Sequence, residues 1–301
     1  MLAAVALLGF VVGHHRSGTP PVSREAKTGI ASVANVVLEY PADWKPAAGG
    51  PPVAGLGLTG GLLLAPGTDA RRAGLAGGSF PAGEASPIPS RLLSLLKVPP
   101  HGEVVGIPAG QAYRYRLASI PGYRGSVELF VIPGEANAGD TALACYAGAG
   151  FASEQQQCSQ IVARLSLSGQ AELDLTPNAG YAHKLEAIVG QLNRERLVLR
   201  GELSQASSRA SVGSIASALG AGFASAARAL AVLEPPAVAN DAQRALASSL
   251  QGTGYIYEVL GRAARTDDSA AYTAASGRLK AAESGVDSAL ESFALLGYEQ
   301  S

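Results

Sequence analysis

Residues 209–236 read RASVGSIASALGAGFASAARALAVLEPP, and apolar side chains recur in this stretch at steps of three and four. The stepped positions are Val212, Ile215, Leu219, Phe223, Ala226, Leu230 and Leu233. An α-helix places all of them on one face, so the stretch predicts one long amphipathic helix. The prolines at its end stop the helix, because proline lacks the N–H that the next turn needs.

Similar stretches lie on both sides of this helix, and together they cover residues 177–298. Thr176 can cap a first helix, because the proline after it suits the first helical position. A third helix is expected over residues 238–264, and Asp267 or Asp268 can cap a fourth. Long helices joined by short turns run antiparallel, which predicts an up-down four-helix bundle.

The preceding part of the chain, residues 27–167, has a different pattern. Short β-type runs stand there between glycine and proline residues, at 36–40, 62–65, 104–107, 112–118, 127–133 and 142–146. Two helical stretches, 90–97 and 153–165, interrupt the runs, and the second has an apolar stripe that can cover a sheet. The sequence therefore predicts an α+β fold, an antiparallel sheet flanked by helices and followed by the bundle.

Five motifs in this part carry a resemblance to a known family. They are VVLEYPADWKP (36–46), AGQAYRYRLAS (109–119), VELFVIPG (127–134), TALACYAG (141–148) and CSQIVARLSL (158–167). Their order resembles the PsbP-like family of bacterial exported proteins, over roughly residues 30–167. The resemblance implies an α/β/α sandwich with a twisted antiparallel sheet, and a non-catalytic accessory or binding role. The helical part is assigned to no family.

The first residues suggest export. Residues 1–13, MLAAVALLGFVVG, are apolar and uncharged, and a helix of this length is short for a membrane span. We expect a secretory signal or membrane anchor that is truncated at its start, since a basic beginning is missing. Residues 14–26 read as a polar linker, in which His14 and His15 are expected to be solvated.

Cys145 and Cys158 are the two cysteines of the chain. In an exported protein, an even number of cysteines favours a disulfide, because oxidising compartments preserve such bonds. The alternatives are two buried free thiols and a redox or metal pair, although the spacing is not the two-residue gap of those motifs.

The charge balance restricts the classes of partner. The chain has 23 Lys and Arg against 24 Asp and Glu, a formal net charge of −1, with no run of five like charges. Nucleic-acid binding usually requires a basic face, so no nucleic-acid partner is expected. The expected partners are a membrane, through residues 1–13, and an envelope protein that contacts the helical bundle.

Three arginines are candidate ligand-binding residues. In the strand at 112–118, Tyr113 and Tyr115 point to one face of the sheet, and Arg114 and Arg116 point to the other. With Arg124 close in sequence, these arginines can receive an anionic group; the alternative is a solvated sheet face. Trp44, the single tryptophan, is expected to pack beneath the sheet.

Motifs for catalysis and cofactors are missing from the sequence. It contains no Gly-x-Ser-x-Gly elbow and no phosphate-binding loop, so no nucleotide is expected. The glycine pattern at 55–60 precedes a predicted strand, whereas a dinucleotide site needs a helix there. His183 and Glu186 form one reversed pair rather than a di-iron motif, and His101 lies in a predicted turn. We expect no metal and no cofactor.

These features favour a non-catalytic binding or scaffolding protein of the bacterial cell envelope, secreted or tethered by its N-terminus. One alternative is a carrier of a small apolar ligand, which a closed apolar cavity would support. The other is a hydrolase with an unrecognised site, which a perturbed titratable group in a polar cleft would support. Because only residues 168–175 separate the two parts, we expect the parts to touch.

Overall fold

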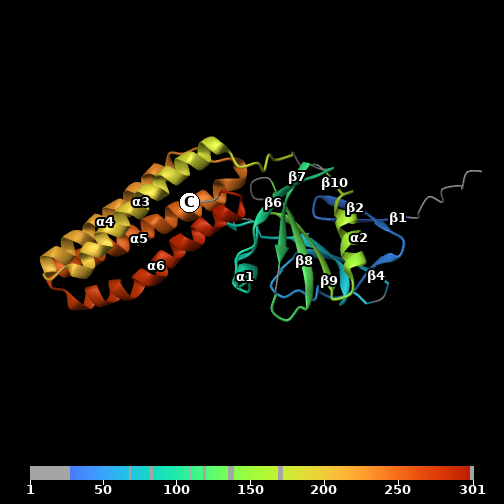
Figure 1. Ribbon diagram of the computed structural model, residues 1–301, viewed down its shortest axis with the longest axis horizontal. Helices are drawn as coiled ribbons and strands as arrows, with labels where there is room; N and C mark the ends of the chain where they lie inside the picture. The colour runs from blue at the N-terminus through green and yellow to red at the C-terminus, as the bar shows by residue number, and fades with distance from the viewer. Residues whose placement is uncertain are drawn as a thin grey trace, which may run out of the picture.

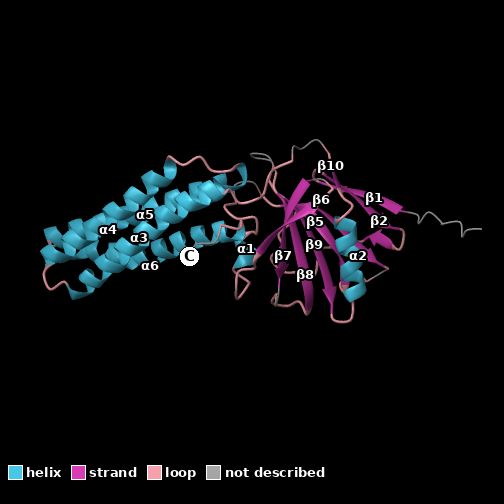
Figure 2. Cartoon of the chain, turned by 45° about the horizontal axis from the view of Figure 1, so that its top comes forward, coloured by secondary structure: helices cyan, strands magenta, loops and turns pink. Residues whose placement is uncertain are grey.

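A computed structural model describes residues 28–67, 69–81, 84–108, 110–117, 120–134, 139–168 and 172–298. The expected signal or anchor at 1–13 and the linker at 14–26 lie outside the described residues. The described chain forms an antiparallel β-sheet part and an elongated helical part, placed end to end (Figures 1 and 2). The predicted α+β class and the C-terminal helical region are confirmed.

The larger sheet has seven strands, all antiparallel to their neighbours. In spatial order these are β3 (Trp44–Pro46), β4 (Thr59–Pro66), β5 (Ala73–Ser79), β9 (Thr141–Gly148), β8 (Gly125–Ile132), β7 (Gly110–Leu117) and β6 (Gly102–Ile107). A smaller sheet joins β1 (Thr28–Val33), β2 (Val36–Pro41) and β10 (Ser166–Leu167). Each of the six predicted runs corresponds to a strand of these sheets, but Pro133 lies beyond the end of β8, and residue 118 lies outside the described residues.

One face of the large sheet is covered by the small sheet and by α2 (Ala152–Val162), as Figure 2 shows. Trp44 is buried in this layer, and its Nε1 donates to Gln157 Oε1 of α2 at 3.1 Å. The expected structural role of Trp44 is confirmed. The Cys145–Cys158 disulfide joins β9 to α2 across the same layer, with the two Cα atoms 5.7 Å apart.

Several details of this part differ from the sequence prediction, which also lacks the strands β1, β3 and β10. The helix expected over residues 90–97 is only α1 (Ser90–Leu93), a single turn after a proline-rich segment. The strand β5 was not predicted, because its sequence AGLAGGS lacks β-branched and aromatic residues. Packing explains its composition: a Cβ on Gly74 would lie 2.6 Å from the Tyr146 hydroxyl and the Leu64 carbonyl oxygen.

The helical part contains α3 (Ala179–Gln205), α4 (Arg209–Ala231), α5 (Asn240–Thr266) and α6 (Ser269–Leu295), with a 3₁₀ turn at Ala237–Ala239. The predicted cap at Asp268 is confirmed, since its side chain accepts a hydrogen bond from Ala271 N. The start expected at Thr176 is wrong by two residues: the Asn178 side chain caps α3 by accepting from Tyr181 N at 2.9 Å.

The four helices pack as a bundle. Helices α4 and α5 approach most closely, and Gly220 and Gly254 face each other across that contact. Arg200 of α3 forms an ion pair with Glu283 of α6, which also accepts a hydrogen bond from Tyr257 of α5 at 2.7 Å.

Of the described helices, α4 alone is long and apolar enough to cross a membrane by length and composition. Its Leu219 and Phe223, however, are buried within the bundle.

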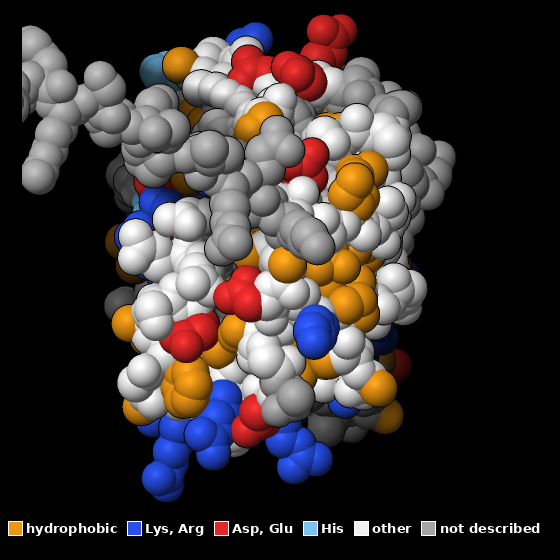
Figure 3. Space-filling model, turned by 90° about the vertical axis from the view of Figure 1, so that its right-hand side faces the viewer, with side chains coloured by type: hydrophobic (Ala, Val, Ile, Leu, Met, Phe, Trp, Pro, Cys, Tyr) orange, Lys and Arg blue, Asp and Glu red, His pale blue; other side chains and the backbone are white. Residues whose placement is uncertain are grey.

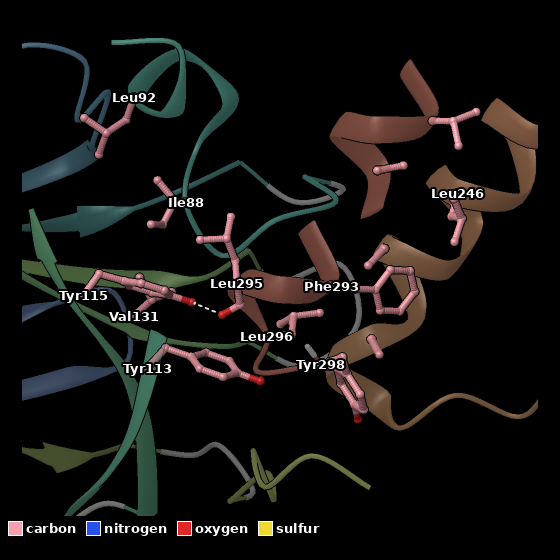
Figure 4. Packing of buried hydrophobic residues seen from close by; sticks show 14 of the residues in the cluster. Ile88, Leu92, Tyr113, Tyr115, Val131, Leu246, Phe293, Leu295, Leu296 and Tyr298 are labelled. Atoms are coloured by element: carbon pink, nitrogen blue, oxygen red, sulfur yellow. Dashed lines mark hydrogen bonds between the residues drawn. The ribbon is translucent and has the colours of Figure 1, made fainter. Parts of the chain in front are cut away.

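The two parts share one hydrophobic core, as expected from the short connection. Tyr113, Tyr115 and Val131 on the second face of the sheet lie opposite Leu295 and Leu296 at the end of α6 (Figure 4). The cluster of buried residues then continues along the bundle. The second face of the large sheet therefore packs against the end of the bundle as well as against α1.

Candidate functional site

A cavity of about 480 Å³ lies at the junction between the sheet and the bundle. Six segments of the described chain contribute to its wall: the β5–α1 connection, β7, the β8–β9 connection, the segment before α3, the start of α5 and the end of α6. The lining residues are Pro81, Glu84, Ala85, Ser86, Pro87, Tyr113, Pro133, Gly134, Gly139, Asp140, Leu173, Ala237, Val238, Asn240, Asp241, Arg244 and Leu296. Both parts of the chain are needed to form it. We call this cavity the junction cleft.

Asp140 lies immediately before β9, and its backbone and its side chain are both held in place. Its main-chain oxygen accepts a hydrogen bond from Phe80 N at 2.8 Å. Its side-chain Oδ1 accepts from Gly134 N, at the other end of the β8–β9 connection, at 3.1 Å. The preceding Gly139 has a φ of +72°, a conformation that glycine adopts without strain. This geometry directs the Asp140 carboxyl group toward the junction cleft.

The environment of Asp140 favours its protonated form. Burial, the largest cause, raises the pKa of Asp140 to about 6, and the charge of Asp241 across the junction cleft adds to the rise. The hydrogen bond from Gly134 N opposes it by stabilising the carboxylate. No ion pair to Asp140 is formed by the described residues. Within the described part of the chain, the Asp140 carboxyl group therefore has no cationic partner.

Tyr113 contributes a second polar group with an unusual environment. The residue is 1% exposed, and its hydroxyl finds no hydrogen-bond partner among the described atoms. Its ring projects from β7 toward the end of the bundle, near Leu296 and Tyr298 (Figure 4). Burial raises the pKa of Tyr113 well above its usual value, so the phenol stays neutral. A buried hydroxyl without a partner is costly in a fold, so it calls for a physical explanation, and a functional role is one of those explanations.

The bundle wall of the junction cleft is charged. Asp241 and Arg244, one turn apart near the start of α5, form an ion pair with each other. Asn240 Nδ2 donates to Ala237 O at 3.2 Å. With Glu84 on the opposite wall, the described lining contains three carboxyl groups and one guanidinium group.

The three predicted arginines lie elsewhere. Arg114 and Arg116 project from β7 on the face opposite Tyr113, as the alternation predicts, and neither lines the junction cleft. Arg114 donates to Glu103 at 2.5 Å, and Arg116 Nε lies 3.5 Å from Glu128 Oε1. The hydrogen bond from Arg114 is the largest cause that lowers the pKa of Glu103. An external anion would have to displace these carboxylates.

Arg124 is exposed in the turn before β8. No contact brings it to the other two arginines, so the described structure does not assemble the proposed trio. Binding of an anion at Arg114, Arg116 and Arg124 therefore stays a prediction.

The predicted disulfide is present: Cys145 and Cys158 are bonded with an S–S distance of 1.99 Å. Among the described residues, no group of three or more His, Cys, Asp and Glu side chains is placed to hold a metal ion. The glycine pattern at 55–60 is followed by β4, so the strand expected after it is confirmed.

The residues of the junction cleft were not found by sequence reasoning. The strand alternation predicts the correct face for Tyr113, but nothing near it in sequence identifies the residues that it meets. Asp140 and Asp241 lie about a hundred residues apart, and neither belongs to a motif. A polar residue directly before a buried strand was the one available signal for Asp140.

A second cavity, of about 350 Å³, lies at the far end of the bundle. It is lined by Val212, Ala263, Ala264 and Tyr272, with the Arg209–Asp267 ion pair at its edge.

No family model and no curated protein matches this chain.

Proposed function

We propose that this protein is a non-catalytic, extracytoplasmic binding protein that holds a small molecule in the junction cleft. The observation that carries the proposal is Tyr113, which lines a cleft formed by both parts of the chain and whose hydroxyl has no partner among the described atoms. Cavities of about 300–1,000 Å³ accommodate drug-sized ligands, and they occur preferentially between domains. The junction cleft has this size and this position.

The Cys145–Cys158 disulfide supports an oxidising compartment outside the cytoplasm. The finer location is part of the proposal: residues 1–13 act as the export signal or the anchor that holds the protein at the bacterial envelope. The end of the molecule farthest from the bundle carries Lys, Arg, Asp and Glu side chains (Figure 3). Its mixed charge suits a soluble surface rather than a nucleic-acid interface.

The chemistry of the lining favours binding over catalysis. The described lining has no histidine that could act as a base for Ser86, and the Ser86 hydroxyl already accepts a hydrogen bond from Ile88 N at 3.2 Å. A small apolar ligand fits the junction cleft less well, because carboxyl groups line several of its walls. Asp140, whose pKa is about 6, is the feature that favours a hydrolase as the alternative.

Native mass spectrometry of the full chain tests the proposal. After incubation with a small-molecule extract of bacterial envelopes, the wild type should retain a compound of defined mass. Ala85→Trp and Val238→Trp fill the junction cleft from opposite walls and should abolish retention. Ala274→Trp, on an exposed position of α6, is the matched control and should retain the compound.

The same experiment separates the alternatives. If the released compound has its original mass, the protein binds without turnover; a hydrolysed product identifies the hydrolase instead. Equal retention by the wild type and both cleft variants would show that the ligand binds elsewhere and would contradict the proposal. Absence of any retained compound would also contradict it.

A second candidate function is docking of an envelope protein on the bundle. Leu197 and Val198 on α3 favour it, because they are 78% and 60% exposed. A photo-crosslinking residue at position 197 in the living cell should capture one protein, while the same residue at position 202, a polar position of α3, should not. Equal capture at both positions would indicate random collision.

A further inference from the structure

The charges around the junction cleft are unbalanced. Glu84, Asp140 and Asp241 come from three different segments, and Arg244 is the one guanidinium group in the described lining. Arg244 is already paired with Asp241. The wall formed by the sheet part therefore presents carboxyl groups without a cation of their own.

Asp140 has capacity for another partner. Its Oδ1 accepts one backbone hydrogen bond from Gly134 N, whereas a carboxylate offers about four acceptor positions. A partly buried carboxylate with so few partners is destabilised relative to water, and a nearby positive charge would restore much of its solvation. A cationic ligand would supply that charge.

The Tyr113 hydroxyl provides an independent indication of a ligand. Tyr113 is almost fully buried and lines the junction cleft, and its hydroxyl lacks a partner among the described atoms. A neutral phenol can accept a hydrogen bond from an N–H group and donate one to an oxygen. A ligand group between Tyr113 and Asp140 would satisfy both residues.

We propose that the ligand of the junction cleft is a small organic cation, whose ammonium group binds at Asp140 and Tyr113. This inference rests on the proposed function and names its ligand class. The apolar body of the ligand packs against Pro87, Leu173, Val238 and Leu296. Glu84 and Asp241 add to the negative potential, and Arg244 limits it on the α5 side.

Binding is expected to depend on pH. Because the pKa of Asp140 is about 6, its charge is largely lost in more acidic solution, and an ammonium ligand then loses its main partner. Glu84 and Asp241 also face the junction cleft, and Asp241 is paired with Arg244. Affinity for a cation should therefore rise between about pH 5 and about pH 7.5.

Three probes of similar shape and different charge test the proposal: phenethylammonium, 2-phenylethanol and 3-phenylpropionate. Each is titrated at millimolar concentration into the full chain, and the amide signals of Gly134 and Gly139 are followed by NMR. We expect the cation to bind at least about tenfold more tightly than the other two near pH 7.5, which corresponds to about 1.4 kcal/mol.

Variants assign the effect to the proposed residues. Asp140→Asn should remove most of the preference for the cation and its pH dependence, while Tyr113→Phe should weaken cation binding several-fold and retain the pH dependence. Glu39→Gln removes an exposed carboxylate on the small sheet and should bind like the wild type.

The proposal is overturned if the neutral or anionic probe binds as tightly as the cation, or if Asp140→Asn leaves the preference intact. It is also overturned if none of the probes gives a saturable shift of these amides. None of these results bears on retention of a compound by the junction cleft in native mass spectrometry, so the ligand class and the proposed function can fail separately.

Discussion

The hydroxyl of Tyr115 donates a 2.8 Å hydrogen bond to the main-chain carbonyl of Leu295, and this contact joins the large sheet to the last residue of α6. The last four carbonyls of a helix lack partners within the helix. A side chain from the sheet therefore satisfies a helix end that the bundle itself leaves open. Gly102 beside it has no room for a Cβ, which would lie 2.6 Å from the same carbonyl oxygen.

Tyr115→Phe should destabilise the protein. The change leaves a buried carbonyl at the junction without its donor, which costs about 1–3 kcal/mol. Urea unfolding followed by circular dichroism measures this loss. Tyr255→Phe, at a residue that is 61% exposed, is the control and should change the free energy of unfolding little. An unchanged free energy for Tyr115→Phe would show that the hydrogen bond contributes nothing to the junction.

Tyr113→Phe, two residues away on the same strand face, should have the opposite effect. Its hydroxyl is buried without a partner among the described atoms, so its removal relieves a desolvation cost of about 1 kcal/mol or more. Thermal unfolding of the ligand-free protein should show a higher midpoint. A lower midpoint would mean that the hydroxyl has a stabilising partner after all.

The disulfide should contribute substantially to stability. Cys145 and Cys158 are 13 residues apart, and closing a loop of about this length stabilises a fold by about 3 kcal/mol. The comparison is between the oxidised wild type and the Cys145→Ala, Cys158→Ala double variant in urea. If the double variant is as stable as the oxidised protein, the bond serves another purpose than stability.

The contact between α4 and α5 depends on the absence of side chains. A Cβ on Gly261 would lie 2.6 Å from Ser217 Oγ and 2.7 Å from the carbonyl oxygen of Gly213, so Gly261→Ala should separate the helices and cost about 1–3 kcal/mol.

Gly252 on the same helix is the matched control. A Cβ there meets nothing within 4 Å, so Gly252→Ala should stabilise the protein by up to about 1 kcal/mol through helix propensity. Opposite signs of the two changes in denaturant unfolding are expected. Two changes of the same sign would contradict the close packing.

Asp140 should make stability fall as the pH rises through the acidic range. Its pKa is raised to about 6 in the folded protein, above the value of about 3.9 in an unfolded chain. Between these values the folded state binds more protons than the unfolded state, so this group favours folding at low pH and loses that contribution as the pH approaches about 6.

The free energy of unfolding of Asp140→Asn, measured at several pH values, isolates this contribution. The difference between the variant and the wild type should shift in favour of the variant as the pH rises from about 4 to about 6.5. A constant difference would show that the Asp140 carboxyl group has the same pKa in both states.

Much of the fold can be predicted from residues that are close together in the sequence. The apolar steps from Val212 to Leu233 are set by the helical period, so the helix follows from neighbours three and four residues apart. The alternation of Tyr113, Arg114, Tyr115 and Arg116 likewise places each side chain on its side of the sheet without knowledge of the rest. The disulfide could be predicted from the even number of cysteines and from the expectation that the protein is exported.

Features that depend on distant parts of the chain could not be predicted from local patterns. The glycines of β5 read as a turn-rich segment, because their close neighbours are distant in sequence. Tyr146, which leaves no room for a Cβ on Gly74, comes from a strand about seventy residues later. Asn178 and Thr176 are both adequate caps for α3. The tertiary structure favours Asn178, because the Tyr298 hydroxyl accepts a hydrogen bond from Asn178 N at 3.2 Å.

The amino-acid order alone determined the periodic elements, their faces and the division into a strand-rich and a helix-rich half, because these depend on interactions between near neighbours. The junction cleft, in contrast, depends on the tertiary structure. Tyr113, Asp140 and Asp241 belong to three segments that share no motif, and the end-on packing of the bundle against the sheet brings them to one cavity.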